Sequence, residues 1–178
     1  FHSKVVVNEI LKLKKYKILG FLDEKKKIGT VINKIHNLKI IGKLSKLKKL
    51  NNKNTYFFIA VGENFKRAKI YESLKKKTKE RIKWCKLISK DTIISKDVKI
   101  GVGTLIVNGS IINPDTKIGK HCIINTKSVI EHDNHFDDFT STGPAVATGG
   151  NVKIKKFSHI GIGSIVKNNI TINKNTIV

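Results

Sequence analysis

The chain contains no methionine, and its 178 residues include two prolines, two cysteines and one tryptophan. Cys85 and Cys122 lie far apart and form no CxxC motif, so we expect reduced thiols in a cytoplasmic protein. No stretch approaches about eighteen uninterrupted apolar residues, which argues against a membrane span. The first residues lack the layout of a signal peptide. Because the chain begins at Phe1 and ends within a repeat, we expect sequence to be missing at both ends.

Acidic residues are few, and the formal net charge is +23. Arginine is also scarce, because Arg67 and Arg81 are the only arginines among 36 basic residues. A nucleic-acid-binding module usually adds arginine forks and stacking aromatic residues to its basic patch. Such a module is therefore an alternative that the composition does not favour. We interpret most lysines as solvated surface residues whose positive field would help a phosphate-bearing ligand to approach.

Residues 1–88 alternate between helical and extended patterns. The apolar spacing predicts helices over Lys4–Lys17 and Glu63–Glu80, and strands over Lys17–Glu24, Asn54–Gly62 and Arg81–Ile88. Strand, helix and strand in this order indicate a small parallel α/β domain. Ligands of such domains bind at the carboxyl ends of the strands, where Asp23, Glu24 and Gly62 lie.

From Ile94 onward the period of the sequence changes to six. Every sixth residue from Ile94 to Val178 follows one ladder, and twelve of its fifteen positions are Ile or Val. A small or β-branched residue stands four places after most of them, as at Thr104 and Ser110. This repeat predicts a parallel β-helix over residues 89–178, in which three repeats close one triangular turn. Six-residue repeats belong to left-handed coils, and Cys122 takes one of the small inward positions.

The ladder weakens beside the stretch EHDNHFDDF, residues 131–139. His132, Asp133, His135 and Asp137 could be metal ligands on paper, but neighbours on an extended segment point to opposite sides. A solvated polar loop is a second interpretation. A third is an acid–base site, in which a carboxylate orients an outward histidine that acts as a general base. Hexapeptide coils are associated with acyl transfer, so we favour the acid–base site by analogy.

Several motifs make the resemblance to one family specific. They are NTKSVIEHD (125–133), GGNVKI (149–154), HIGIGS (159–164), FLDE (21–24), FIAVGEN (58–64) and the residues His2, Ser3 and Lys4. With these motifs the chain resembles the bacterial sugar acetyltransferases that act on nucleotide-linked amino sugars, and the related sialic-acid O-acetyltransferases. The resemblance covers nearly the whole chain.

The resemblance implies two domains and a homotrimer. Residues 1–88 would form a Rossmann-like domain that holds the nucleotide sugar and lacks its first strand. Residues 89–178 would form the acetyltransferase coil, without its last turns and with acetyl-CoA bound between adjacent subunits. Neither a metal nor a membrane span is implied.

The resemblance also implies roles for ten residues. His132 would be the general base and Asp133 its orienting carboxylate. Gly150 would bind the oxyanion, and Ile162 would lie on the acetyl-CoA side. The substrate-binding residues would be Asn125 for the sugar and His2, Asp23, Glu24, Val61 and Gly62 for the nucleotide.

The activity implied is acetyl transfer from acetyl-CoA to the amine of a UDP-linked 4-amino-4,6-dideoxy sugar, for surface glycan biosynthesis. O-acetylation of a sialic-acid-type sugar is the nearest alternative, since the same base could activate a hydroxyl. The basic nucleic-acid-binding module and an inactive structural trimer are alternatives from other classes.

Overall fold

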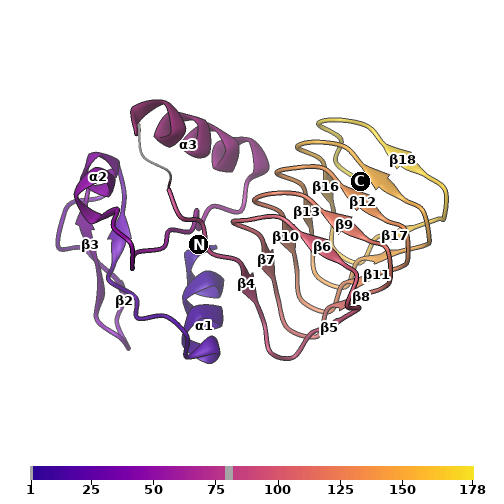
Figure 1. The fold of residues 1–178 in the computed structure, drawn as a ribbon, viewed down its shortest axis with the longest axis horizontal. Helices are drawn as coiled ribbons and strands as arrows, with labels where there is room; N and C mark the ends of the chain where they lie inside the picture. Colours follow the sequence, from indigo (N-terminus) through magenta and orange to yellow (C-terminus); the bar gives the residue numbers. More distant parts are fainter. Residues whose placement is uncertain (1, 79–81) are drawn as a thin grey trace.

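The computed structural model describes residues 2–78 and 82–178. Figure 1 shows an N-terminal group of helices and short strands lying beside a three-sided coil of stacked strands. Within the described ranges, no helix is long and apolar enough to cross a membrane.

Among its described residues, the N-terminal part contains three α-helices and one small sheet. Its elements are α1 (Ser3–Leu13), β1 (Phe21–Leu22), β2 (Val31–Asn33), β3 (Leu38–Gly42), the 3-10 helix η1 (Leu44–Lys46), α2 (Leu47–Leu50) and α3 (Asn64–Lys77). The sheet has the order β1-β3-β2. In it, β1 runs parallel to β3, whereas β2 runs antiparallel to β3.

The predictions for this part are confirmed for the helices and partly wrong for the strands. Both predicted helices form, but the first ends at Leu13 instead of Lys17, because Lys14 adopts a left-handed conformation. The second ends at Lys77, and residues 79 and 80 of its predicted range lie outside the described residues. The strand predicted over Lys17–Glu24 shortens to β1, and the partner of β1 is β3, which was not predicted.

The strand predicted over Asn54–Gly62 is wrong apart from a single parallel bridge between Phe57 and Trp84. The reason lies at its end, where the carbonyls of Val61 and Gly62 accept hydrogen bonds from the Arg67 side chain instead of from a neighbouring strand. Likewise, the strand predicted over Arg81–Ile88 reduces to this bridge and β4, and Arg81 lies outside the described residues.

The coil consists of three five-stranded parallel sheets. The first sheet contains β4 (Leu87–Ile88), β7 (Leu105–Ile106), β10 (Ile123–Ile124), β13 (Ser141–Thr142) and β16 (His159–Ile160). The second contains β5 (Ile93–Ile94), β8 (Ile111–Ile112), β11 (Val129–Ile130), β14 (Ala147–Thr148) and β17 (Ile165–Val166). The third contains β6 (Lys99–Ile100), β9 (Lys117–Ile118), β12 (His135–Phe136), β15 (Lys153–Ile154) and β18 (Thr171–Ile172).

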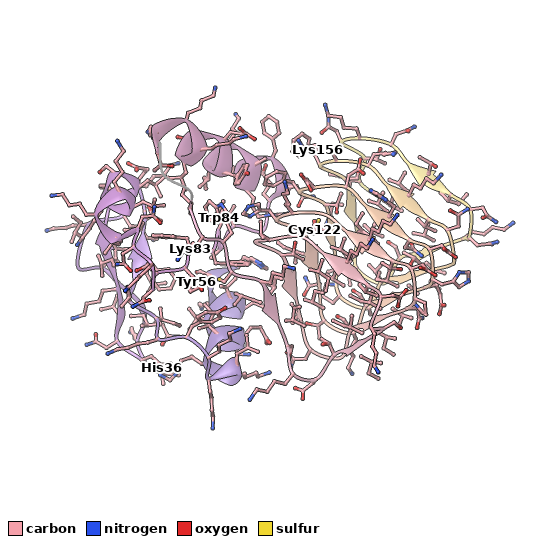
Figure 2. The ribbon with its side chains drawn as sticks, viewed as in Figure 1. His36, Tyr56, Lys83, Trp84, Cys122 and Lys156 are labelled. Atoms are coloured by element: carbon pink, nitrogen blue, oxygen red, sulfur yellow. The ribbon has the colours of Figure 1, made fainter. Side chains whose placement is uncertain are left out.

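The six-residue ladder forms the core of the coil, as the sequence predicts. The second residue of each strand points inward, and from Ile106 to Ile160 these residues are at most 3% exposed. Cys122 fills an inward position, is fully buried, and its Sγ lies 3.3 Å from Thr140 Oγ1. Figure 2 shows its sulfur within the coil. The prediction that Cys122 is a small core residue is therefore confirmed.

The outward residues give each sheet a different face. On the first sheet, Leu87, Leu105 and Ile123 pack against residues of α1. The outward residues of the second sheet are all apolar: Ile93, Ile111, Val129, Ala147 and Ile165. Those of the third sheet are mostly basic: Lys99, Lys117, His135, Lys153 and Thr171. The N-terminal part thus covers the first face and leaves the apolar second face open.

Arg67 joins the N-terminal part to the coil. This α3 residue is 1% exposed. Its Nε donates to His121 O at 2.7 Å and its Nη2 to Thr140 O at 3.4 Å, while Nη1 donates to the carbonyls of Val61 and Gly62 at 3.0 and 2.8 Å. Burial lowers the pKa of Arg67 to about 10. No ion pair joins it to a carboxylate in the described part of the chain.

An aromatic cluster lines the same junction. His121 and Phe139 occupy equivalent corners of successive turns at positive φ, and their rings stack with centroids 5.3 Å apart. Tyr71 of α3 and Trp84 also contact His121, and Figure 2 shows Trp84 between the N-terminal part and the coil. Both ring nitrogens of His121 are buried without a partner in the described residues. Burial, followed by the charge of Arg67, lowers the pKa of His121 to about 4.

This buried neutral histidine predicts that the protein loses stability in mild acid. The unfolded chain binds a proton at His121 near pH 6.5, whereas the folded chain resists protonation down to about pH 4. Stability should therefore be complete above pH 6.5 and decrease as the pH falls towards 4, by roughly 1–3 kcal/mol. Thermal unfolding measured across this pH range tests the expectation.

The control variant is His121→Phe, because Phe139 shows that this ring fits the corner. The variant should flatten the pH dependence without removing it, since burial also lowers the pKa of His2 to about 4. An unchanged dependence in the variant would contradict the assignment.

Candidate active site

His132 and Asp133 lie in the turn between β11 and β12, where the second and third sheets meet. His132 Nδ1 lies 2.8 Å from Asp133 Oδ2, and the two side chains are 60% and 57% exposed. Asp133 adopts φ 60°, a conformation that Asp tolerates better than most residues, and its N–H donates to Pro114 O at 3.0 Å. The turn therefore holds an imidazole and a carboxylate together on the outer edge of the coil.

Gly150 lies directly beneath the His132 ring. It occupies the equivalent corner one turn later, between β14 and β15. A Cβ at this position would lie 2.6 and 2.7 Å from Cε1 and Nε2 of His132, so any larger residue would displace the ring. The N–H of Gly150 donates no hydrogen bond within residues 2–78 and 82–178. A hydrogen-bond donor is thus free beside the imidazole.

The hydrogen bond that Asp133 accepts from His132 raises the pKa of His132 above its ordinary value, and the charges of Asp133 and Glu131 act in the same direction. Because Nδ1 is engaged by Asp133, Nε2 is the nitrogen that can accept a proton from a ligand. This arrangement is that of an oriented general base.

Asn134 fixes the backbone around this pair, although it stands at an inward position of the repeat that favours a small residue. Its Nδ2 lies 2.7 Å from Glu131 O and 2.8 Å from Gly149 O, so one side chain ties the His132 turn to the Gly150 turn. Asn134 is 1% exposed. An amide at such an inward position departs from the repeat, but only the structure shows what Asn134 binds.

The metal-site alternative is not supported by the geometry. His135 Nε2 lies 3.3 Å from Asp137 Oδ1, so the two histidines of the stretch belong to separate histidine–carboxylate pairs. Among the described residues, no three His, Cys, Asp or Glu side chains form a group that could hold a metal ion.

Asn125 and Ile162 lie at another corner of the coil, where the first and second sheets meet. Asn125 N–H donates to Thr142 Oγ1 at 2.9 Å, and Asn125 Oδ1 accepts from Thr126 N–H at 2.9 Å. Ile162 is 79% exposed. Within one chain, these two residues therefore do not join His132.

His2, Val61 and Gly62 come together at the junction between the N-terminal part and the coil. The His2 side chain lies 3.5 Å from where a Cβ on Gly62 would be. His2 Nε2 is buried and has no partner among the described atoms. Arg67 holds the carbonyls of both Val61 and Gly62. These three predicted nucleotide-binding residues are thus neighbours in space.

Asp23 and Glu24 follow β1 and bind their own loop. Asp23 Oδ1 accepts from the N–H groups of Lys25 and Lys26 at 2.8 and 2.9 Å. Burial tends to raise the pKa of Asp23, but these hydrogen bonds, with the charges of Lys26 and Lys43, hold it below its ordinary value. Glu24 Oε1 accepts from Leu44 N–H at 2.9 Å. Both carboxylates stabilise the end of the small sheet.

Residues 2–74 match the model of the PglD N-terminal domain family. A search of curated proteins found no match.

Solved structures match almost the entire chain. PerB from Caulobacter crescentus, solved in complex with CoA and GDP-perosamine, is 26% identical with a TM-score of 0.85, covering 99% of this chain and 80% of PerB. The acetyltransferase domain of PglB from Neisseria gonorrhoeae, in complex with acetyl coenzyme A, is 22% identical with a TM-score of 0.72, covering 99% and 88%. WeeI from Acinetobacter baumannii is 20% identical with a TM-score of 0.64, covering 100% and 90%.

The stacked parallel sheets and the six-residue ladder define a parallel β-helix, the fold that the chain shares with PerB. More particularly, the resemblance to the bacterial sugar N-acetyltransferases is confirmed. Residues 2–74 match the PglD N-terminal domain, and PerB aligns with 99% of the chain.

The contact between Gly150 and the imidazole predicts that Gly150→Ala moves His132. The added methyl group would occupy the space of Cε1 and Nε2, and the exposed ring can turn away. We expect the pKa of His132 to fall back towards its ordinary value as the bond to Asp133 is lost. Titration of the imidazole by NMR measures this.

The matched control is Gly163→Ala, because a Cβ at Gly163 meets no atom within 4 Å. Gly163 has φ 69°, so that variant should lose stability and leave the His132 titration unchanged. If both variants left the titration unchanged, the contact would not determine the position of the ring.

Proposed function

We propose that the chain is an acetyl-CoA-dependent acetyltransferase that acetylates the amine of a nucleotide-linked amino sugar. The observation that carries the proposal is the His132–Asp133 pair, held over the free N–H of Gly150 at the edge of the coil. The likeness to PerB, solved with CoA and GDP-perosamine, supports both the donor and the class of acceptor.

The geometry suggests the following reaction. The sugar amine attacks the thioester carbonyl of acetyl-CoA, and Nε2 of His132 takes the proton that the nitrogen loses. Asp133 stabilises the resulting imidazolium, while the N–H of Gly150 donates a hydrogen bond to the oxyanion. The C–S bond then breaks, and the imidazolium returns its proton to the CoA thiolate. The products are the N-acetyl sugar and CoA. None of these steps requires a metal.

We further propose that the coil is left-handed and that residues 1–88 are part of a Rossmann-like domain. The match to the PglD N-terminal domain supports the second statement. The coil domain would comprise residues 89–178. The last strand of the first domain, β4, would pair with β7 and so belong to the first sheet of the coil. The acetyl-CoA donor and the free thiols of Cys85 and Cys122 fit the cytoplasmic location that we propose.

A homotrimer would assemble the complete site. Within one chain, three corners of the coil carry different parts of the proposed site. The first carries the His132–Asp133 pair, the second Asn125 and Ile162, and the third lies beside the group of His2, Val61 and Gly62. The second sheet lies between the first two of these corners, and its outward residues are all apolar. If this face turned inward to a three-fold axis, it would bring the His132 corner of one subunit beside the Ile162 corner of the next.

Both UDP-linked and GDP-linked 4-amino-4,6-dideoxy sugars are candidate acceptors. We expect N-acetylation, because the neighbour named by its activity is a GDP-perosamine N-acetyltransferase. Turnover of a panel of both classes of nucleotide sugar with acetyl-CoA tests the function. Acetylation of free sialic acid but of no nucleotide sugar would contradict it.

His132→Ala should lower turnover by about 10²–10⁴, because the sugar amine would lose its general base. The melting temperature should barely change, since the side chain is 60% exposed. Steady-state kinetics and thermal unfolding together test this. Loss of turnover through unfolding alone would show that His132 is structural.

The pH profile should follow the titration of His132. A general base works only when deprotonated, so kcat/KM should fall as the pH decreases through the raised pKa of His132, above 6.5. Asp133→Asn should move this decrease of kcat/KM to lower pH, because the carboxylate that raises the pKa of His132 is lost. The backbone should be unchanged, since Asn also tolerates φ 60°. A decrease at the same pH in the variant would argue that another group titrates.

Val129→Glu should dissociate the trimer, because it places a charge in the middle of the apolar second face. Lys117→Glu on the third face is the control and should stay trimeric. Light scattering coupled to gel filtration measures the assembly, and turnover should be lost with it. A trimeric Val129→Glu variant would overturn this orientation of the subunits.

A further inference from the structure

Ser141 and His159 form a polar pair on the otherwise apolar first face. They are outward residues of the paired strands β13 and β16, and Ser141 Oγ lies 2.9 Å from His159 Nδ1. Ser141 is 5% exposed and His159 is partly buried. The outward residues of the earlier strands of this sheet, Leu87, Leu105 and Ile123, form a column with this pair and are covered by α1. The column therefore changes from packing residues to hydrogen-bonding residues at β13.

The pair lies beside the turn that contains Val61 and Gly62. The Arg67 guanidinium donates to Gly62 O at 2.8 Å and to Thr140 O at 3.4 Å, and Thr140 directly precedes Ser141. Asn64 Nδ2 donates to the O of Ser158, the residue before His159, at 2.9 Å. The first turn of α3 thus fixes the backbone of both members of the pair and the turn at 61–62 in one arrangement.

The chemistry of His159 suits a hydroxyl group. Burial lowers its pKa, a hydrogen bond with the Ser141 backbone acts in the opposite direction, and the charge of Arg67 lowers the pKa further. The lowered pKa favours the neutral form of the ring, which is a poorer ligand for phosphate than the imidazolium. Nδ1 is held by Ser141, and Nε2 has no hydrogen-bond partner in the part of the chain that the structure describes. A neutral ring with one fixed and one free nitrogen can exchange a directional hydrogen bond with a ligand.

We propose that His159 Nε2 binds a ring hydroxyl of the acceptor sugar, and that Ser141 is the positioning residue that fixes the imidazole. This inference rests on the proposed function, in which the nucleotide is held near Val61 and Gly62. A sugar attached to that nucleotide would extend over the neighbouring first face. The pair then determines which sugar is accepted, while His132 of another subunit deprotonates its amine.

Two substitutions of His159 separate the two ring nitrogens. His159→Asn keeps a hydrogen-bonding group near Nδ1 and removes the one at Nε2, whereas His159→Gln does the reverse. The affinities of both variants are measured by calorimetry for the nucleotide sugar of the panel that binds tightest, and for its nucleoside diphosphate alone. We expect His159→Asn to weaken binding of the nucleotide sugar about 3- to 10-fold and to leave the nucleoside diphosphate unaffected. His159→Gln should retain most of the affinity.

Ser141 is tested by Ser141→Ala with Ser141→Thr as the control that retains the hydroxyl. The alanine variant should weaken nucleotide-sugar binding about 2- to 5-fold, because the imidazole loses its fixed orientation, and the threonine variant should restore it. In steady-state kinetics, KM for the sugar should rise while KM for acetyl-CoA stays unchanged. A purely structural role would lower the melting temperature without this split.

Analogues that each lack one sugar hydroxyl identify the contact. For the analogue without the bound hydroxyl, wild type and His159→Asn should have equal affinity, and for the others the difference should persist. Equal affinity of both proteins for every nucleotide sugar would overturn the inference, as would an equal loss for the nucleoside diphosphate. The binding measurement needs no turnover, so failure of the acetyltransferase assay alone would count against the proposed function and not against the pair.

Discussion

The structure depends on one buried cation. Arg67 is almost completely shielded from water, and all of its hydrogen-bond acceptors are neutral: four backbone carbonyls and the Asn64 amide. Burying a charge without an opposite charge is costly unless every one of its hydrogen-bond donors has an acceptor. The planar guanidinium meets this condition, because its N–H groups can donate to several acceptors in one plane. The turn at 61–62 and the carbonyls of His121 and Thr140 therefore have a single mutual arrangement. Lysine could not replace Arg67, because one ammonium group cannot reach both sides of the junction.

Because of this junction, each face of the coil has a different role. Once α1 and α3 lie against the first sheet, that face carries the N-terminal part and the Ser141–His159 pair. The second face remains apolar and open, which suits contact between subunits. The corner beyond it carries His132 over Gly150, where rigid stacked turns hold an exposed side chain in place. The distribution of the proposed site over separate corners is the reason for our proposal that assembly completes it.

The corners show how the coil accommodates residues that its repeat disfavours. Asp133 and Phe139 both adopt positive φ, which costs little for Asp and more for a bulky aromatic residue. The stacking of Phe139 against His121 and its contact with Tyr71 of α3 compensate for this strain. Asn134 similarly brings an amide into the dry interior and uses it to tie the His132 and Gly150 turns together. These exceptions to the repeat lie where the coil meets α3 and where it carries the His132–Asp133 pair.

The sequence by itself determined the coil and the pairing of His132 with Asp133. The six-residue period fixes which residues point inward, since parallel stacking repeats one geometry, and adjacency in sequence places Asp133 beside His132. The amino-terminal helices were also predictable from their local period, whereas β3 and the irregular course of residues 54–62 were not. Only the tertiary structure decided the rest: Arg67, Asn134 and the Ser141–His159 pair act through residues far away in the sequence. Such contacts depend on how the elements meet, and no local pattern encodes that.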